Sequence, residues 1–214
     1  FEEMIDYQTI IQKYYPTDNR LRHILLEHSR SVTQKALGIT QLHPELKANE
    51  TFIEEAAMLH DIGIYLCNAP GIECFGNEPY ICHGILGANL MRHEGLPEHA
   101  RVCERHTGAG LTRTSIIEQN LPLPHRNFLP ETIEEKIICY ADKFFSKTHL
   151  DHEKPSRKPN KVSRNSVPKN LLASKSGTPS SPKKPCKTQG NNTTGQPPDT
   201  FCRYRAFYLS LRAI

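Results

Sequence analysis

Histidines and aspartates in the first two thirds of the chain are the residues whose types and spacing could do chemistry. Ten of the 11 histidines lie within residues 1–149. An adjacent pair, His60-Asp61, ends the apolar segment AAMLHDIG. A helix places adjacent side chains about 100° apart, so the pair can bind one metal ion together only if a helix end or a second ion brings them round. A His-Asp pair is common, and its interpretation therefore depends on other positions.

His28 and Asp142 favour a metal site because each lies on the apolar face of a predicted helix. His28 follows Ile24 by four residues, and Asp142 follows Ile138 by four. A carboxylate on an apolar helix face is costly unless it is paired or binds a metal. Imidazole and carboxylate together suit a divalent transition metal that keeps positions open for water.

Two further histidines extend the set. His83, in YICHGILGANL, shares a face with Leu86 and Leu90, and His106 is followed by glycines that let backbone approach a ligand closely. Taken singly, each histidine is better interpreted as an ordinary core histidine. Taken together, six residues from four or five helices favour a shared site for two ions. The predicted ligands are His28, His60, Asp61, His83, His106 and Asp142.

Helices joined by loops are predicted to position these residues, and no convincing alternating strand is found, so an all-α fold is expected. The segments 63–79 and 107–130 are predicted to be loops because glycine and proline punctuate them, and the second is long enough to form a lid. The predicted helices are 5–14, 17–38 with Thr17 or Asp18 as cap and Gly38 as stop, 49–60 capped by Asn49, 80–94 stopped by Gly95, 97–106, and 131–149.

Charge divides the chain into two segments. Residues 1–150 hold 14 basic and 20 acidic residues, whereas residues 151–214 hold 13 basic and 3 acidic residues and half of the 16 prolines. The net charge of +4 therefore describes neither segment, and a long nucleic acid is not expected as substrate. The low-complexity tail at 151–214 is predicted to be disordered. The alternatives are a basic arm for anionic partners, a membrane-surface helix and an out-of-frame translation.

The protein is expected to be cytoplasmic. No apolar run of about 18 residues predicts a membrane span, and the acidic start FEEMIDYQTI lacks the order of a secretory signal. Met4 is a candidate native start. The seven cysteines are scattered without a CxxC pair, which favours buried free thiols over a disulfide framework.

The order of the six candidate ligands resembles the HD-domain superfamily of metal-dependent phosphohydrolases, whose signature HDIG matches at residues 60–63. The phrases HGILGA, RHTG and EEKIICYADK resemble the subset with two extra histidines, which includes the HD-type diadenosine tetraphosphate hydrolases. The resemblance covers roughly residues 17–150 and implies a helical HD domain at 4–150. It does not reach the tail, where relatives would be expected to continue with further helix.

The resemblance implies hydrolysis of a phosphate ester or anhydride in a nucleotide or small metabolite. His28, His60, Asp61 and Asp142 would be the core ligands, with Asp61 bridging two ions and His83 and His106 completing the second. His60 and Asp61 are the expected catalytic residues, because two divalent ions (Fe, Mn, Co, Ni or Zn) can supply hydroxide at neutral pH. A di-iron oxygenase and a non-catalytic ligand-sensing module remain the alternative functions.

Basic residues near the ligands are candidates for binding a substrate phosphate, which arginine can clamp with a bidentate fork. Two adjoin predicted ligands and three lie in the predicted loop at 107–130. An ordinary solvated charge is the alternative at each position. The candidates are Lys143, Arg105, Arg113, His125 and Arg126.

Overall fold

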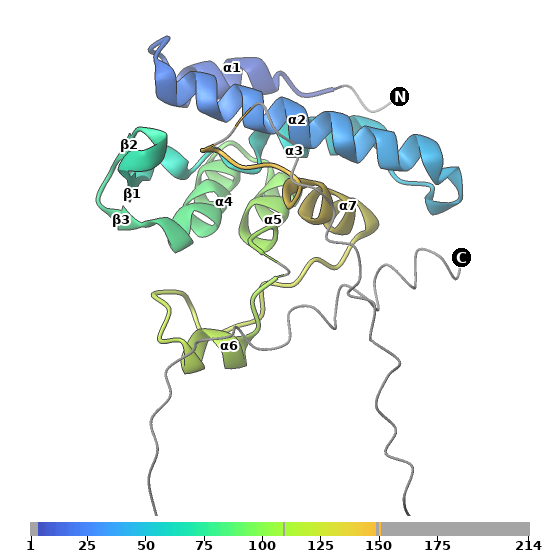
Figure 1. Ribbon diagram of the computed structural model, residues 1–214. Helices are drawn as coiled ribbons and strands as arrows, with labels where there is room; N and C mark the ends of the chain where they lie inside the picture. Colours follow the sequence, from blue (N-terminus) through green and yellow to red (C-terminus); the bar gives the residue numbers. More distant parts are fainter. Residues whose placement is uncertain (1–3, 109, 149, 151–214) are drawn as a thin grey trace, which may run out of the picture. The chain divides into compact units, whose positions relative to one another are not determined.

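The computed structural model describes residues 4–108, 110–148 and 150, and helices dominate them (Figure 1). None of the helices in this part of the chain is both long enough and apolar enough to cross a membrane. The α-helices are α1 (Tyr7–Tyr14), α2 (Arg20–Leu42), α3 (Glu50–Leu59), α4 (His83–His93), α5 (Pro97–Arg105), α6 (Arg113–Glu118) and α7 (Ile133–Asp142). The fold is therefore helical, as predicted.

Helix α2 is the long element against which α3 and α7 pack, while α4 packs against α5 (Figure 1). The buried side chains of α2 recur on one face, which is the pattern of a helix with one apolar stripe. Leu25 belongs to a core cluster with side chains of α3, α4 and α5. Val32 and Ala36 belong to a second cluster with α3 and α7. His28 lies between these two groups of residues along α2.

Side-chain caps fix where five of the described helices begin, α2, α3 and α7 among them. The Oδ1 atom of Asn49 accepts a hydrogen bond from the backbone of α3 at 3.0 Å, as predicted. The cap of α2 is Asn19 rather than Thr17 or Asp18, because its Oδ1 atom accepts from the Arg22 N–H at 3.0 Å. Thr132 caps α7 in a capping box.

Helix α2 continues past Gly38 to Leu42, so the predicted stop is wrong. A glycine ends a helix by taking a positive φ, and Gly38 is not among the residues with one. Beyond it, Ile39 packs on the second core cluster and the Thr40 hydroxyl donates to Glu50 at 2.9 Å. Gly95 does take a positive φ of 76° and follows the end of α4.

The segment predicted as a loop at 63–79 contains a small sheet, which corrects the prediction of no strands. Strand β1 (Cys67–Ala69) pairs antiparallel with β2 (Cys74–Phe75) and parallel with β3 (Glu78–Pro79). Strands of two or three residues are too short to show alternation in a sequence, which takes about four or more.

The segment at 107–130 is also more ordered than predicted. It holds α6, which a capping box between Thr112 and Ser115 begins. A bridge joins Leu111 to Phe128, and Phe128 and Ile116 share a small core cluster. The two ends of the segment are thus joined by backbone hydrogen bonds as well as by apolar packing.

Helix α7 ends at Asp142 rather than at 149. The backbone N–H groups of Lys143, Phe144 and Phe145 each bond to the carbonyl three residues earlier, at 3.2–3.3 Å. Bonds of this spacing tighten the end of a helix and turn the chain away from its axis. The predicted disorder of 151–214 lies outside the described residues. The described cysteines Cys67, Cys74, Cys82 and Cys103 are free and buried, as predicted, and Cys139 is buried as well.

Candidate metal centre

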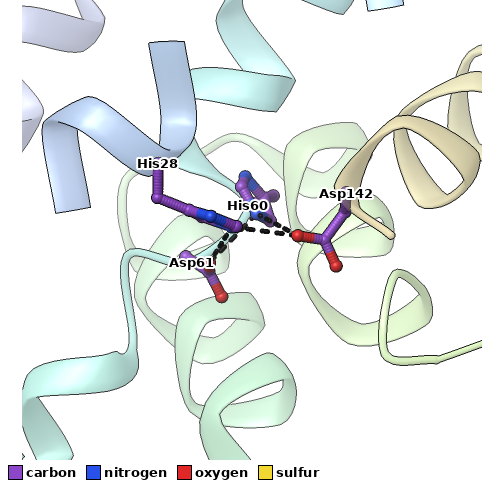
Figure 2. Close-up of side chains that lie close together, drawn as sticks. All are labelled: His28, His60, Asp61 and Asp142. Carbon is purple, nitrogen blue, oxygen red and sulfur yellow. Dashed lines mark ion pairs between the residues drawn. The ribbon is translucent and has the colours of Figure 1, made fainter. Parts of the chain in front are cut away.

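Four of the predicted ligands converge between α2, the end of α3 and the end of α7 (Figure 2). The Nε2 atom of His28 lies 3.1 Å from Asp61 Oδ2 and 2.9 Å from Asp142 Oδ1. The Nε2 atom of His60 lies 3.0 Å from Asp61 Oδ2 and 3.6 Å from Asp142 Oδ1. These four residues therefore form one group of nitrogen and oxygen atoms.

A second group forms on the other oxygen of Asp61. His83, the first residue of α4, and His106, which follows α5, place their Nε2 atoms 3.0 Å apart. Both nitrogens face Asp61 Oδ1, at 3.5 Å and 3.4 Å. In each group, one potential ligand atom per residue lies within 4.8 Å of the others. The structure thus brings all six predicted ligands together, with Asp61 shared.

The end of α3 makes this sharing possible. Helix α3 ends at Leu59, and His60 and Asp61 follow in a turn whose next N–H groups, at Ile62 and Ile64, bond three residues back. Tyr15, which follows α1, holds the turn by donating its hydroxyl proton to the carbonyl of Ile62 at 2.9 Å. From the sequence, a helix end or a second ion could bring the adjacent pair together, and the structure contains the helix end.

Backbone carbonyls orient three of the four histidine rings. The Nδ1 atoms of His60, His83 and His106 lie 2.6 Å, 2.6 Å and 2.7 Å from carbonyl oxygens three residues earlier. A carbonyl only accepts, so each Nδ1 carries a proton and Nε2 faces the cluster, where it offers a lone pair whenever the ring is neutral. Two such lone pairs 3.0 Å apart, on His83 and His106, repel each other unless a proton or a cation lies between them.

The cluster suits the binding of cations, because its side chains are buried and several of its nitrogen and oxygen atoms lack hydrogen bonds. The side chains of His28, His60 and Asp61 are at most 1% exposed, and that of Asp142 is 19% exposed. The Nε2 atoms of both histidines and both oxygens of Asp61 are buried without a hydrogen bond. Buried polar groups normally have partners. Imidazole nitrogens and carboxylate oxygens are donors that divalent transition metals accept, so the residues present fit such ions.

The charges of the cluster depend on its burial and on the acidic and basic side chains that lie together in it. Burial by itself would raise the pKa of Asp61, but His60 and Lys147 hold that pKa well below its usual range. Burial lowers the pKa of His60, whereas the carboxylates of Asp61 and Asp142 outweigh it and raise the value to about 10. Burial lowers the pKa of His83 to about 4. Burial would likewise raise the pKa of Asp142, but His28 and His60 hold it well below its usual range, so both aspartates are anionic at neutral pH.

Lys147 is a residue of this site that the sequence analysis missed. Its Nζ atom lies 2.6 Å from Asp61 Oδ2, and its side chain is 12% exposed. In the predicted helix to 149, Lys147 would stand about 140° round from Asp142. The early end of α7 therefore decides its position, and nothing in the apolar periodicity indicated it.

A cavity of about 570 Å³ lies beside the first group of predicted ligands. Two lysines, two hydroxyl side chains and several apolar or aromatic side chains line it together with His28 and Asp142. Its lining residues are His28, Ala69, Gly71, Ile72, Tyr80, Gly108, Asp142, Lys143, Phe145, Ser146, Lys147 and Thr148.

Lys143 is the predicted substrate contact that lines this cavity, and burial lowers its pKa to about 8. The other candidates, Arg105, Arg113, His125 and Arg126, are not among its lining residues. Their role as substrate contacts stays a prediction that this arrangement does not support.

Two of these arginines form ion pairs with glutamates of α5, α7 and the segment before α7. Arg105 lies 2.8 Å from Glu131 and 3.4 Å from Glu135, and Arg126 lies 3.0 Å from Glu104. Glu104 and Glu135 are buried, and a buried carboxylate needs a partner. The sequence pattern could not reveal these pairs because the partners come from different elements.

Comparison with known proteins gives relatives in archaea. Two are tRNA (cytidine(56)-2'-O)-methyltransferases: that of Thermoplasma volcanium is 30% identical over 138 residues, covering 64% of this chain and 35% of the relative. That of Picrophilus torridus is 31% identical over 144 residues, covering 63% and 38%. An uncharacterized protein of Methanocaldococcus jannaschii is 35% identical over 121 residues, covering 55% and 64%.

The chain spans little more than a third of either methyltransferase. No solved structure matches it. The sequence model of the HD domain matches residues 25–146, a segment that holds all six residues of the cluster. Because this match covers more than half of the sequence, the chain belongs to the HD domain family.

Proposed function

We propose that this protein is a metal-dependent phosphohydrolase that cleaves an ester or anhydride bond in a small organic phosphate or nucleotide. The observation that carries the proposal is the pair of buried ligand groups that share Asp61. Two divalent transition-metal ions bound there would supply a hydroxide and neutralise charge on the phosphoryl oxygens. The HD domain match is consistent with this chemistry.

The chain's own residues hold and orient this centre. His28, His60 and Asp142 would hold one ion, and His83 and His106 the other. Asp61 would contact both, because its two oxygens face different groups. The carbonyl bonds to Nδ1 keep three imidazoles in the tautomer that offers Nε2 to a metal. His60 and Asp61 are thus assigned to catalysis as ligands.

The cavity beside His28 and Asp142 is the proposed binding site for the substrate. Its volume of about 570 Å³ lies in the usual range for small-molecule sites. Ile72, Tyr80 and Phe145 provide apolar and aromatic surface for an organic group. Lys143 provides a cation beside the ligand Asp142. A small phosphorylated compound fits these features, and the acidic composition of residues 1–150 disfavours a long nucleic acid.

The names of two relatives raise methyl transfer to tRNA as another activity. This chain spans 35% and 38% of those proteins, and the cluster found here consists of metal-ligand types. Such a cluster suits activation of water, and we therefore assign hydrolysis rather than methyl transfer to this segment.

Metal analysis followed by a substrate screen tests the proposal. The full chain is loaded separately with Mn²⁺, Co²⁺, Ni²⁺, Zn²⁺ and ferrous iron, and then assayed with mono-, cyclic and dinucleoside polyphosphates. We expect cleavage of a phosphate bond by wild type and none by Asp61→Ala. Oxygen consumption by the iron-loaded protein without phosphate cleavage would instead support the oxygenase alternative. Full metal content without turnover would support the ligand-sensing module.

A further inference from the structure

We propose that Lys147 binds the phosphate group of the substrate, and that a metal ion held at Asp61 leaves Lys147 to make this contact. This inference rests on the proposed function and deepens it, because it names the residue that the anionic end of the substrate meets. Lys147 belongs neither to the predicted ligands nor to the predicted substrate contacts.

Its position is fixed by the chain around it. The Nζ atom of Lys147 lies 2.6 Å from Asp61 Oδ2 and 6.0 Å from the centre of the Tyr80 ring. On either side, the hydroxyls of Ser146 and Thr148 lie 2.9 Å apart, and the Thr148 N–H donates to the Ser146 hydroxyl at 3.4 Å. This short turn places Lys147 on the cavity wall, beside the ligand Asp142.

The positive charge of Lys147 needs a neighbouring anion as long as the side chain keeps its buried position. Its side chain is 12% exposed, and a largely buried ammonium group is costly without a paired anion. In the described part of the chain, the carboxylate that forms an ion pair with it is Asp61. This pair lacks the angles of a hydrogen bond, since Asp61 Oδ2 has no such partner.

Metal ions and Lys147 compete for the same oxygen atom. Asp61 Oδ2 is the atom that His28 and His60 face in the first ligand group. A cation held by this group would therefore pair with the carboxylate oxygen that Lys147 contacts in this structure. Lys147 is then left beside the centre with its positive charge uncompensated.

An anion that enters the cavity supplies the missing charge. Because Lys143 and Lys147 both line the cavity, a phosphate group there meets two cationic side chains as well as the centre. The apolar wall at Ala69, Ile72 and Phe145 remains for the organic part of the substrate. This arrangement orients the substrate with its phosphate toward the ligand cluster.

Phosphate binding to the full chain loaded with Mn²⁺ tests the inference, with inorganic phosphate as probe and calorimetry as readout. We expect Lys147→Met to keep the metal content of wild type and to raise the Kd for phosphate about 10–100-fold, the usual loss for a hydrogen bond to a charged group. Lys147→Arg, which keeps the charge, should bind more tightly than Lys147→Met. The control is Lys136→Met, which removes a lysine of α7 that does not line the cavity.

Three results would overturn the inference: a phosphate Kd in Lys147→Met within twofold of wild type, equal binding by the arginine and methionine variants, or loss of metal from Lys147→Met. The last would make Lys147 a support of the metal cluster. The proposed function fails separately. If wild type hydrolyses no phosphate compound but binds phosphate through Lys147, hydrolysis is wrong and the anion site stands. If Lys147→Met hydrolyses its substrate with an unchanged KM, the anion site is wrong and hydrolysis stands.

Discussion

A single side chain, Asp61, joins the two halves of the candidate centre. Its oxygens face different pairs of histidines, at 3.0–3.1 Å on one side and 3.4–3.5 Å on the other. The side chain is completely buried, so a change at this position cannot be compensated by water. The effect of removing Asp61 should therefore differ from that of removing a ligand of one group.

Metal stoichiometry is expected to report this difference. Asp61→Ala should lose both ions, because it removes an oxygen from each group. His83→Ala should retain about one ion per chain, since the group of His28, His60 and Asp142 stays complete. Elemental analysis of the purified variants measures both outcomes.

His93→Ala is the matched control, because this exposed histidine lies on the same helix as His83 but outside the cluster. It should keep the metal content of wild type. Full metal content in Asp61→Ala would show that the ions bind elsewhere.

At the scale of elements, the turn after α3 lies directly against α4. A Cβ atom at Gly63 would stand 2.4 Å from the Gly87 backbone nitrogen and 2.5 Å from the His83 carbonyl oxygen. The contacting atoms are backbone, so they cannot move away as a flexible side chain would. The final glycine of HDIG is therefore required by the close approach that brings His60 and His83 to one site.

Alanine substitutions at two glycines should have opposite effects on stability. Gly63→Ala is expected to lower the free energy of unfolding by about 1–3 kcal/mol through overpacking. Gly38→Ala, inside α2 with open space around its Cβ position, should raise it by about 0.5–1 kcal/mol because glycine is the poorer helix former. Denaturant unfolding measures both, and a stable Gly63→Ala would contradict the close approach.

Helix α1 is tied to the end of α4 by a polar contact with a defined pH dependence. Lys13 lies 2.7 Å from Glu94, and the Tyr14 hydroxyl donates to the same carboxylate. These bonds lower the pKa of Glu94 below its ordinary value of 4.5. The stabilisation is therefore present above pH 4.5 and is lost as the pH falls through the lower folded pKa.

Glu94→Gln should reduce the free energy of unfolding by about 0.5–1 kcal/mol at pH 7, as for partly exposed ion pairs. The difference from wild type should shrink as the pH falls below 4.5. Urea unfolding over this pH range, with a chelator in every sample, measures it. Glu118→Gln, at an exposed position of α6, should show no such trend. A difference that persists at low pH would rule out the carboxylate as its source.

At the scale of the whole molecule, the cluster of candidate ligands joins elements that belong to two apolar cores. His28 lies on α2 between the residues of the two clusters, and His60 follows the helix that contributes to both. Buried carboxylates and imidazoles at such a place are costly without cations. Metal binding should therefore stabilise the fold as well as the site.

Metal removal is expected to lower the melting temperature by about 5–10 °C. This follows from about 2.7 kcal/mol of stabilisation at a metal concentration 100 times the Kd and from about 2–4 °C per kcal/mol for a chain of this size. Thermal unfolding with and without a chelator measures the shift. Asp61→Ala should melt at the same temperature in both conditions, and equal melting of metal-loaded wild type in both would contradict a buried metal centre.

The sequence by itself determined the features that depend on neighbours along the chain. Apolar periodicity located the helices that carry His28 and His83, and Asn49 and Gly95 marked helix ends through their own caps and backbone angles. Residue type, position on the predicted helices and the resemblance to the HD-domain superfamily together identified the six members of the cluster. Such features are readable because a cap, a stop or an apolar stripe involves residues within a few turns of one another.

Only the tertiary structure decided which distant groups meet. It placed Lys147 against Asp61, paired Arg126 with Glu104 and carried α2 past Gly38. It also formed a sheet and a short helix in segments predicted as loops. The physical reason is that charges, packing and close backbone contacts act through space. Burial of Asp61 among residues from five parts of the chain sets its partners, and no local pattern records that burial.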